Sequence, residues 1–123
     1  MSAPNPEVRN RVVAPRFGGS LPGVHANRWR GMAQATVCAD VTRLELGSND
    51  AGTIVAARHL TYGCPPAIAA AEWLCEYLEG KDLTTVRELT YDEVTSALGL
   101  SPEQDHASQT VVDALRNALK SNT

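Results

Sequence analysis

The spacing of the apolar residues changes once along this chain, at Cys64. Before that point apolar and polar residues alternate, most clearly over residues 41–46, which is the period of a strand with two different faces. After it the apolar residues recur every three or four positions, which is the period of a helix. Strands followed by helices, without βαβ alternation, predict an α+β fold with helices packed on one face of a small antiparallel sheet.

About three strands are expected before Cys64. Residues 41–46 and residues 53–62 are separated by the sequence GSNDAG, which is rich in turn-forming Gly, Asn and Asp. The two strands are therefore expected to form a hairpin. Residues 31–35 are expected to supply a third strand at the edge of the sheet.

Helices are expected over most of the chain beyond Cys64. The Pro65-Pro66 pair is typical of a first helical turn, and Gly80 is expected to stop that helix. Thr90 and Glu93 have the spacing of a capping box, which satisfies backbone N–H groups at a helix start. The expected helices cover residues 65–80, a short stretch at 83–89, residues 90–99 and the segment that follows His106.

Length and charge limit the domain organisation and the partners. A chain of 123 residues is long enough for one core, so residues 1–123 are expected to form a single domain. Residues 1–23 are rich in Pro, Gly and Asn and are expected to form a loosely ordered arm. The net charge of −3 argues against nucleic acid or an anionic membrane surface as a partner, because like charges repel.

The sequence also indicates the compartment. No apolar run approaches the roughly 20 residues that span a bilayer, and the N-terminal sequence lacks the apolar stretch of a secretory signal. Three cysteines are too few, and odd in number, for a disulfide framework. We therefore expect a cytoplasmic protein with reduced thiols, available for metal binding, catalysis or burial.

Four side chains of metal-binding types lie where the chain is expected to change direction. Cys38 and Asp40 are two residues apart, so they project from the same face if that stretch is extended. Cys64 lies between the second strand and the long helix, and His106 precedes the last helix. Thiolate, carboxylate and imidazole all bind zinc or iron. The spacing lacks the C-x-x-C pairs of a zinc ribbon, so buried cysteines, a solvated Asp and a surface His remain the alternative.

Other candidate residues have simpler structural explanations. Cys75 follows Cys64 within the long helix, about 15 Å along its axis, which metal–sulfur bonds of about 2.3 Å cannot span, so it is predicted to lie in the core. His59 alternates with Ala57 and Thr61 and is predicted to lie at the surface or the sheet edge. No Ser/His/Asp grouping or phosphate-binding loop stands out, so the chain is not expected to be an enzyme.

Short motifs occur along the chain in an order that is more specific than any one of them. They are Gly31-Met32, Cys38-Ala39-Asp40-Val41, Tyr62-Gly63-Cys64, Ala67-Ile68-Ala69, Gly80-Lys81 and His106-Ala107-Ser108. These residues resemble the GM pair, the CGD motif, the YGCGSAIA turn, the GK pair and the HCS motif of the IscU/NifU-type iron–sulfur cluster scaffolds. Residues 14–19 also resemble that family's NPRNVG segment.

The resemblance implies a scaffold on which iron and sulfide are assembled into a 2Fe–2S cluster. It implies that sulfur arrives as persulfide from a cysteine desulfurase, and that the cluster passes to apo-protein clients. It implies Cys38, Asp40, Cys64 and His106 as ligands, with Cys38 and Cys64 holding the cluster. It also implies that zinc can occupy the same site.

The chain departs from the family's pattern at positions that the resemblance assigns to cluster assembly and transfer. Ala107 stands where the family has its third cysteine, and a methyl group neither binds iron nor carries sulfur. Residues 100–104 have the sequence LSPEQ where the family has LPPVK, the segment that a dedicated chaperone recognises. The lysine of that segment is therefore lost. Pro65 and Ala39 replace family glycines. Departures at several positions argue against a single engineered replacement at Ala107.

Two thiolates per chain allow three ways of holding a metal ion or a cluster. One chain could hold zinc with Cys38, Asp40, Cys64 and His106, or hold a mixed-ligand 2Fe–2S cluster with the same four residues. Alternatively, two chains could each donate Cys38 and Cys64 to a bridging cluster. The first hypothesis for function is a divergent scaffold or carrier. The alternative is a zinc-bound adaptor that binds a cysteine desulfurase or another assembly protein and assembles nothing itself.

Overall fold

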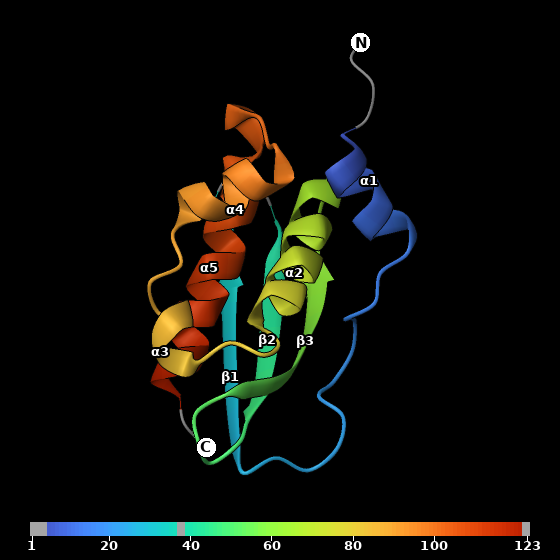
Figure 1. Ribbon diagram of the computed structural model, residues 1–123. Helices are drawn as coiled ribbons and strands as arrows, with labels where there is room; N and C mark the ends of the chain where they lie inside the picture. Colours follow the sequence, from blue (N-terminus) through green and yellow to red (C-terminus); the bar gives the residue numbers. More distant parts are fainter. Residues whose placement is uncertain (1–4, 37–38, 122–123) are drawn as a thin grey trace.

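A three-stranded antiparallel sheet forms one layer of the molecule, and helices form the other (Figure 1). The structure is a computed structural model that describes residues 5–36 and 39–121. The strands lie in the order β1-β2-β3, and each pairs with its neighbour in antiparallel register. Their bounds are Asn27–Gln34 for β1, Val41–Ser48 for β2 and Ile54–Tyr62 for β3. The expected edge strand is present and begins four residues earlier than residue 31.

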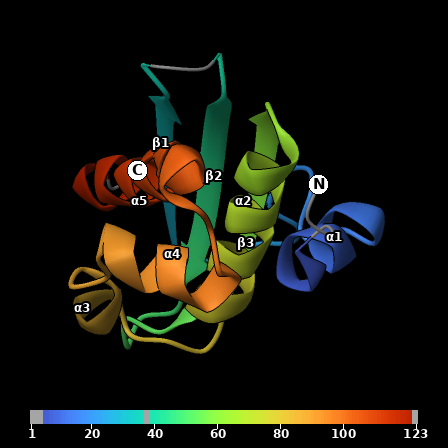
Figure 2. The same cartoon turned by 90° about the horizontal axis from the view of Figure 1, so that it is seen from above.

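The helices cover one face of this sheet, as Figure 2 shows from above. This arrangement confirms the α+β fold. Helix α5 packs on β1 and β2, and α2 packs on β3. None of the described helices has the length and apolarity that crossing a membrane requires. The helices that follow the sheet are α2 at Pro65–Leu78, α3 at Leu83–Val86, α4 at Tyr91–Leu98, a single 3₁₀ turn η1 at Pro102–Gln104 and α5 at Asp105–Lys120.

Helix α4 begins and ends at the residues that the sequence predicts. The Thr90 side chain accepts the backbone N–H of Glu93, and the Glu93 carboxylate accepts the N–H of Thr90, so the capping box of α4 is complete. Gly99 ends α4 with φ of 63°, the left-handed conformation that glycine adopts without steric cost.

The N-terminal segment differs from the loosely ordered arm that we expected over residues 1–23. It contains a helix, α1 at Pro6–Val13, that packs against α2 (Figure 1). The side chain of Asn5 accepts the N–H of Glu7, and Pro6 occupies the first turn. Asn and Pro are loop formers, but in this order they are also the signals that start a helix.

After α1 the chain runs along the free edge of β3, where a buried carboxylate holds it. Glu72 of α2 accepts the backbone N–H groups of Arg16 at 2.6 Å and Phe17 at 2.9 Å. His59 of β3 exchanges backbone hydrogen bonds with Phe17 and Gly19. Its ring nitrogen Nε2 lies 2.8 Å from the same carboxylate.

The prediction that His59 lies at the surface or the sheet edge was therefore wrong about its burial. The residue is only 4% exposed, because residues 16–19 cover the edge of β3 and Glu72 faces its ring. Alternation along a strand shows which residues share a face, but it does not show which distant segment covers that face.

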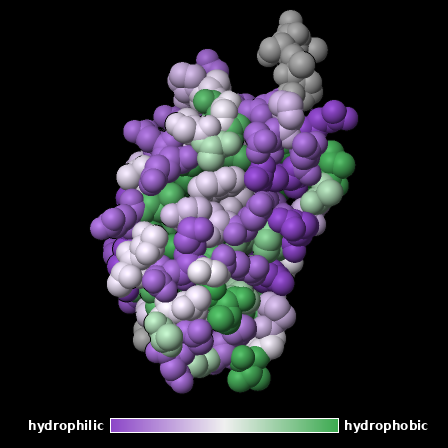
Figure 3. Space-filling model, viewed as in Figure 1, coloured by the Kyte–Doolittle hydropathy of each residue, from purple (hydrophilic) through white to green (hydrophobic). Residues whose placement is uncertain are grey.

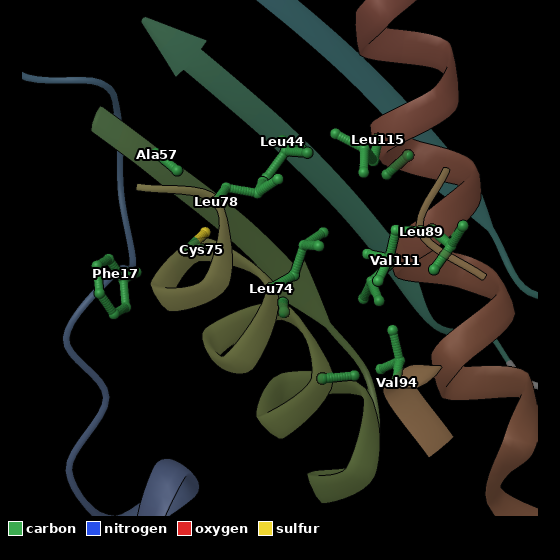
Figure 4. Close-up of a cluster of buried hydrophobic side chains, with 14 of the residues drawn as sticks. Phe17, Leu44, Ala57, Leu74, Cys75, Leu78, Leu89, Val94, Val111 and Leu115 are labelled. Carbon is green, nitrogen blue, oxygen red and sulfur yellow. The ribbon is translucent and has the colours of Figure 1, made fainter. Parts of the chain in front are cut away.

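Figure 4 shows the hydrophobic core between the sheet and the helices. Cys75 lies within it beside Leu78 and Ala57, as predicted, and its side chain is fully buried. Burial raises the pKa of the Cys75 thiol far above its usual range, and the nearby Glu72 carboxylate raises it further. Cys75 is therefore a protonated core residue at neutral pH.

One glycine sets how closely the helical layer approaches the sheet. A methyl group on Gly31 of β1 would overlap the backbone of α5 at Ala114 and Ala118. Since the obstructing atoms are main chain, a larger side chain could be accommodated only if the whole helix moved. This contact gives a physical reason for the Gly31-Met32 pair.

We predict that Gly31→Ala lowers the free energy of unfolding by about 1–3 kcal/mol, because it overpacks the contact between β1 and α5. Urea denaturation measures the change. Gly18→Ala is the matched control, because no atom lies near the added methyl group and its backbone is not left-handed. An equal loss in both variants would mean that the close approach at Gly31 does not limit packing.

We predict that Glu72→Ala lowers the free energy of unfolding by about 3–5 kcal/mol, because it leaves buried partners without their acceptor. The amides of Arg16 and Phe17 should also exchange hydrogen faster. Glu76→Ala is the control, because that carboxylate is half exposed and its ion pairs should contribute about 1 kcal/mol or less. Unchanged exchange at Arg16 and Phe17 in Glu72→Ala would show that this carboxylate does not hold the segment.

Candidate metal centre

Three side chains of types that bind metals meet at one end of the two layers, where β2, α2 and α5 begin and β3 ends (Figure 1). Asp40 immediately precedes β2, Cys64 is the residue before α2, and His106 lies in the first turn of α5. One ligand atom from each side chain lies within 4.8 Å of the other two. Residues separated by up to 66 positions in the sequence therefore form one cluster.

Asp40 is the central member of this cluster. Its carboxylate is almost completely buried and accepts the backbone N–H of Cys64 at 3.0 Å through Oδ1. Its other oxygen, Oδ2, lies 3.3 Å from Cys64 Sγ and 3.1 Å from His106 Nε2. The distance from Cys64 Sγ to His106 Nε2 is 3.6 Å. Oxygen, sulfur and nitrogen thus converge on one small volume.

The imidazole of His106 is oriented by a main-chain carbonyl. Its Nδ1 atom lies 3.2 Å from the carbonyl oxygen of Glu103. A carbonyl only accepts, so Nδ1 carries the hydrogen of this bond. In the neutral ring Nε2 then presents its lone pair to Asp40 and Cys64, which is the geometry of a histidine prepared for metal binding.

Gly63 leaves the space that the Asp40 carboxylate occupies. A methyl group built on Gly63 would overlap the carboxyl carbon and Oδ1 of Asp40. The residue before Cys64 must therefore lack a side chain if the carboxylate is to reach the Cys64 N–H. This explains the glycine of the Tyr62-Gly63-Cys64 motif without reference to backbone conformation.

The donor set fits a borderline metal ion. Thiolate, imidazole and carboxylate are the usual ligands of zinc, and thiolate and imidazole also bind iron in clusters. Three ligands from one chain leave one position of a tetrahedral ion for a fourth residue or an exogenous group. The three atoms lie close enough together to bind one ion after small movements of the side chains.

Three of the four predicted ligand residues are thus brought together by the fold. The fourth, Cys38, lies outside the described residues, so its predicted role stays a prediction. Cys75 is in the core and takes no part in the cluster. Ala107, next to His106, is fully buried. No sequence pattern predicts the contact with the Glu103 carbonyl, because a main-chain acceptor is independent of residue type.

Comparisons of sequence place this chain among known proteins. A family model described as the NifU-like N terminal domain matches residues 5–122. The iron-sulfur cluster assembly scaffold protein IscU of Escherichia coli (strain K12) is 35% identical over 105 residues, which cover 85% of this chain and 82% of that protein. The mitochondrial iron sulfur cluster assembly protein 1 of Eremothecium gossypii is 32% identical over 117 residues, which cover 94% of this chain and 76% of that protein.

Solved structures show the same fold at lower identity. A protein of Fervidobacterium islandicum AW-1, described as a candidate iron–sulfur cluster assembly scaffold for the SUF system, superposes with a TM-score of 0.69 at 14% identity, over 92% of this chain and 93% of that one. The N-terminal part of a nitrogen-fixing NifU-like protein from Brucella abortus gives 0.68 at 15% identity, over 94% and 91%. The chain therefore belongs to the family of NifU-like N-terminal domains, the IscU/NifU-type scaffolds.

Proposed function

We propose that this protein is a divergent scaffold or carrier that holds an iron–sulfur cluster, as cargo, on Cys64, Asp40, His106 and Cys38. The observation that carries the proposal is the convergence of Asp40, Cys64 and His106 within 4.8 Å. The named activity of the Escherichia coli relative, cluster assembly on a scaffold, supports the same conclusion. We propose a 2Fe–2S cluster as the favoured cargo.

The ligand set suits a cluster that must leave again. Oxygen and nitrogen ligands replace some of the thiolates that bind such clusters most firmly, so the mixed set should hold the cluster less tightly than four cysteines would. Asp40 also fixes the turn that presents Cys64, since it accepts the backbone N–H of that residue. Three ligands from one chain favour a cluster held within one chain over one bridged by a homodimer.

The proposed partners are a cysteine desulfurase, which supplies sulfur, and the apo-proteins that receive the cluster. We propose a cytoplasmic location for this protein. Binding of the family's dedicated chaperone is not part of the proposal, because residues 100–104 lack the lysine of its recognition segment. The protein acts in this proposal as a scaffold and not as an enzyme.

A zinc-bound adaptor is the second candidate function. The observation that favours it is the absence of a thiol at Ala107, where the family receives persulfide, together with a donor set that zinc readily accepts. In this case the metal stabilises the end of the fold that binds a desulfurase or another assembly protein. No cluster is then assembled on the chain itself.

We predict that Cys64→Ser abolishes cluster binding, because it removes the thiol that lies beside Asp40 and His106. The test is anaerobic reconstitution with iron, sulfide and a cysteine desulfurase, followed by visible absorption, Mössbauer spectra and metal content. Cys75→Ala is the matched control, because it also removes one thiol but lies in the core.

Each outcome of this reconstitution decides between the two functions. A cluster in the unmodified chain and in Cys75→Ala, but not in Cys64→Ser, supports the scaffold. Uptake of no iron with one zinc retained per chain would reject the scaffold and support the adaptor. An unchanged yield in Cys64→Ser would show that the ligand assignment is wrong.

We predict that Ala107→Cys raises the reconstitution yield, because it adds a thiol next to His106 at the family's third cysteine position. Ala114→Cys is the control, since it adds a thiol to another buried position of α5, about 10 Å further along the helix. Both variants place a larger side chain in the core, so both should lose some stability. An equal yield in the two variants would contradict the assigned role of position 107.

A further inference from the structure

An apolar groove lies beside the candidate metal centre, between α1 and the first turn of α2. Its volume is about 380 Å³. Figure 3 shows hydrophobic side chains at the surface over α1, and three valines of that helix form one wall. The opposite walls come from the first turn of α2 and from the residue that precedes α5. The residues that form the walls are Val8, Val12, Val13, Pro65, Pro66 and Gln104.

The groove and the candidate metal centre share their supporting segments. Pro65 directly follows Cys64, and Gln104 lies two residues before His106. A molecule seated in the groove therefore contacts the same two segments that present the sulfur and nitrogen donors. This continuity places the occupant next to the site at which cargo would be exchanged.

Two of the residues that line the groove are positions at which this chain departs from the family pattern. Pro65 replaces a glycine, and Gln104 stands at the position of the lost lysine. Proline fixes its own backbone angle, so this wall is rigid before any partner arrives. Loss of the lysine leaves the wall neutral. Pro65 thus adds a rigid apolar residue to a surface that the valines of α1 form on the other side.

Among the residues that the structure describes, one charged side chain lines the groove, and it is positive. Arg9 is exposed, and within residues 5–36 and 39–121 its side chain makes neither an ion pair nor a hydrogen bond. None of the described residues that line the groove carries a carboxylate. A guanidinium without a partner beside an apolar surface is complementary to a carboxylate next to an apolar side chain.

The shape and charge of the groove favour a segment of another protein as its occupant. Val13 is 74% exposed, so the groove is open along one side and is suited to an extended peptide. A second copy is disfavoured, because a symmetric contact through this surface would bring two Arg9 side chains together.

We infer that the groove binds an extended segment of a partner protein in which an aliphatic or aromatic side chain neighbours a carboxylate, and so holds that partner beside Cys64. The inference rests on the proposed function, because it takes the partner to be one that exchanges sulfur or cluster at this site. The apolar side chain packs against Val13, Pro65 and Pro66. The carboxylate pairs with Arg9 at the rim.

Reversible disulfide capture at Cys64 tests this inference on the metal-free full-length chain. The probes are three blocked peptides, CGGLE, CGGLQ and CGGGQ, each supplied as a mixed disulfide with a small thiol. Thiol–disulfide exchange joins each peptide to Cys64 and releases the small thiol, and a fixed concentration of reductant keeps the reaction at equilibrium. Intact mass gives the captured fraction, and peptide mapping assigns it to Cys64.

We expect CGGLE to be captured roughly tenfold or more above CGGGQ, because burial of one aliphatic side chain and one ion pair stabilise the adduct. CGGLQ should fall between them. Val13→Ser should remove the preference for leucine, and Arg9→Glu should reverse the preference for glutamate over glutamine. Val24→Ser and Arg87→Glu are the controls, because both residues are exposed and lie outside the groove.

Equal capture of the three peptides by the unmodified chain would overturn the inference, and so would a preference that survives both Val13→Ser and Arg9→Glu. A dimer in sedimentation experiments that is lost in Val13→Ser would also overturn it, because the groove would then belong to a second copy. Capture is measured without metal, whereas the proposed function is tested by cluster loading. Either can therefore fail while the other succeeds.

Discussion

The buried carboxylate of Asp40 is the constraint on which one end of the molecule depends. It accepts the N–H of Cys64 and lies against His106, so the starts of β2, α2 and α5 all meet at it. Gly63 has to lack a side chain for this contact to exist. A buried carboxylate without such partners would cost several kcal/mol, so the same contacts that order the end of the fold also assemble the donor set.

A second buried carboxylate fixes the N-terminal segment in a comparable way. Glu72 binds two backbone N–H groups of residues 16 and 17 and faces the ring of His59. The segment is thereby held along β3, and α1 is held against α2. Composition suggested that the N-terminal segment is a loosely ordered arm. Because α1 forms a wall of the groove beside Cys64, this segment is instead part of the end of the molecule that carries the candidate metal centre.

The departures from the family pattern have a common structural location. Ala107, Pro65 and Gln104 all lie in the two segments that carry Cys64 and His106. They remove a thiol and a lysine next to the remaining donors, and Pro65 and Gln104 add no charge to the groove. The chain thus keeps the fold of the IscU/NifU-type scaffolds, while its surface beside the candidate metal centre differs from the family pattern.

The sequence by itself determined the elements whose signals are local. The alternation over residues 41–46, the capping box of Thr90 and the helical stripe of Cys75 each depend on neighbours within a few positions, so strands, helices and a buried thiol were predicted. It also supplied the donor types of the candidate site. Only the tertiary structure decided that His59 is buried against Glu72, that α1 covers α2, and that Asp40, Cys64 and His106 meet. Those contacts join segments far apart in the chain, and their geometry is set by the packing of helices on the sheet.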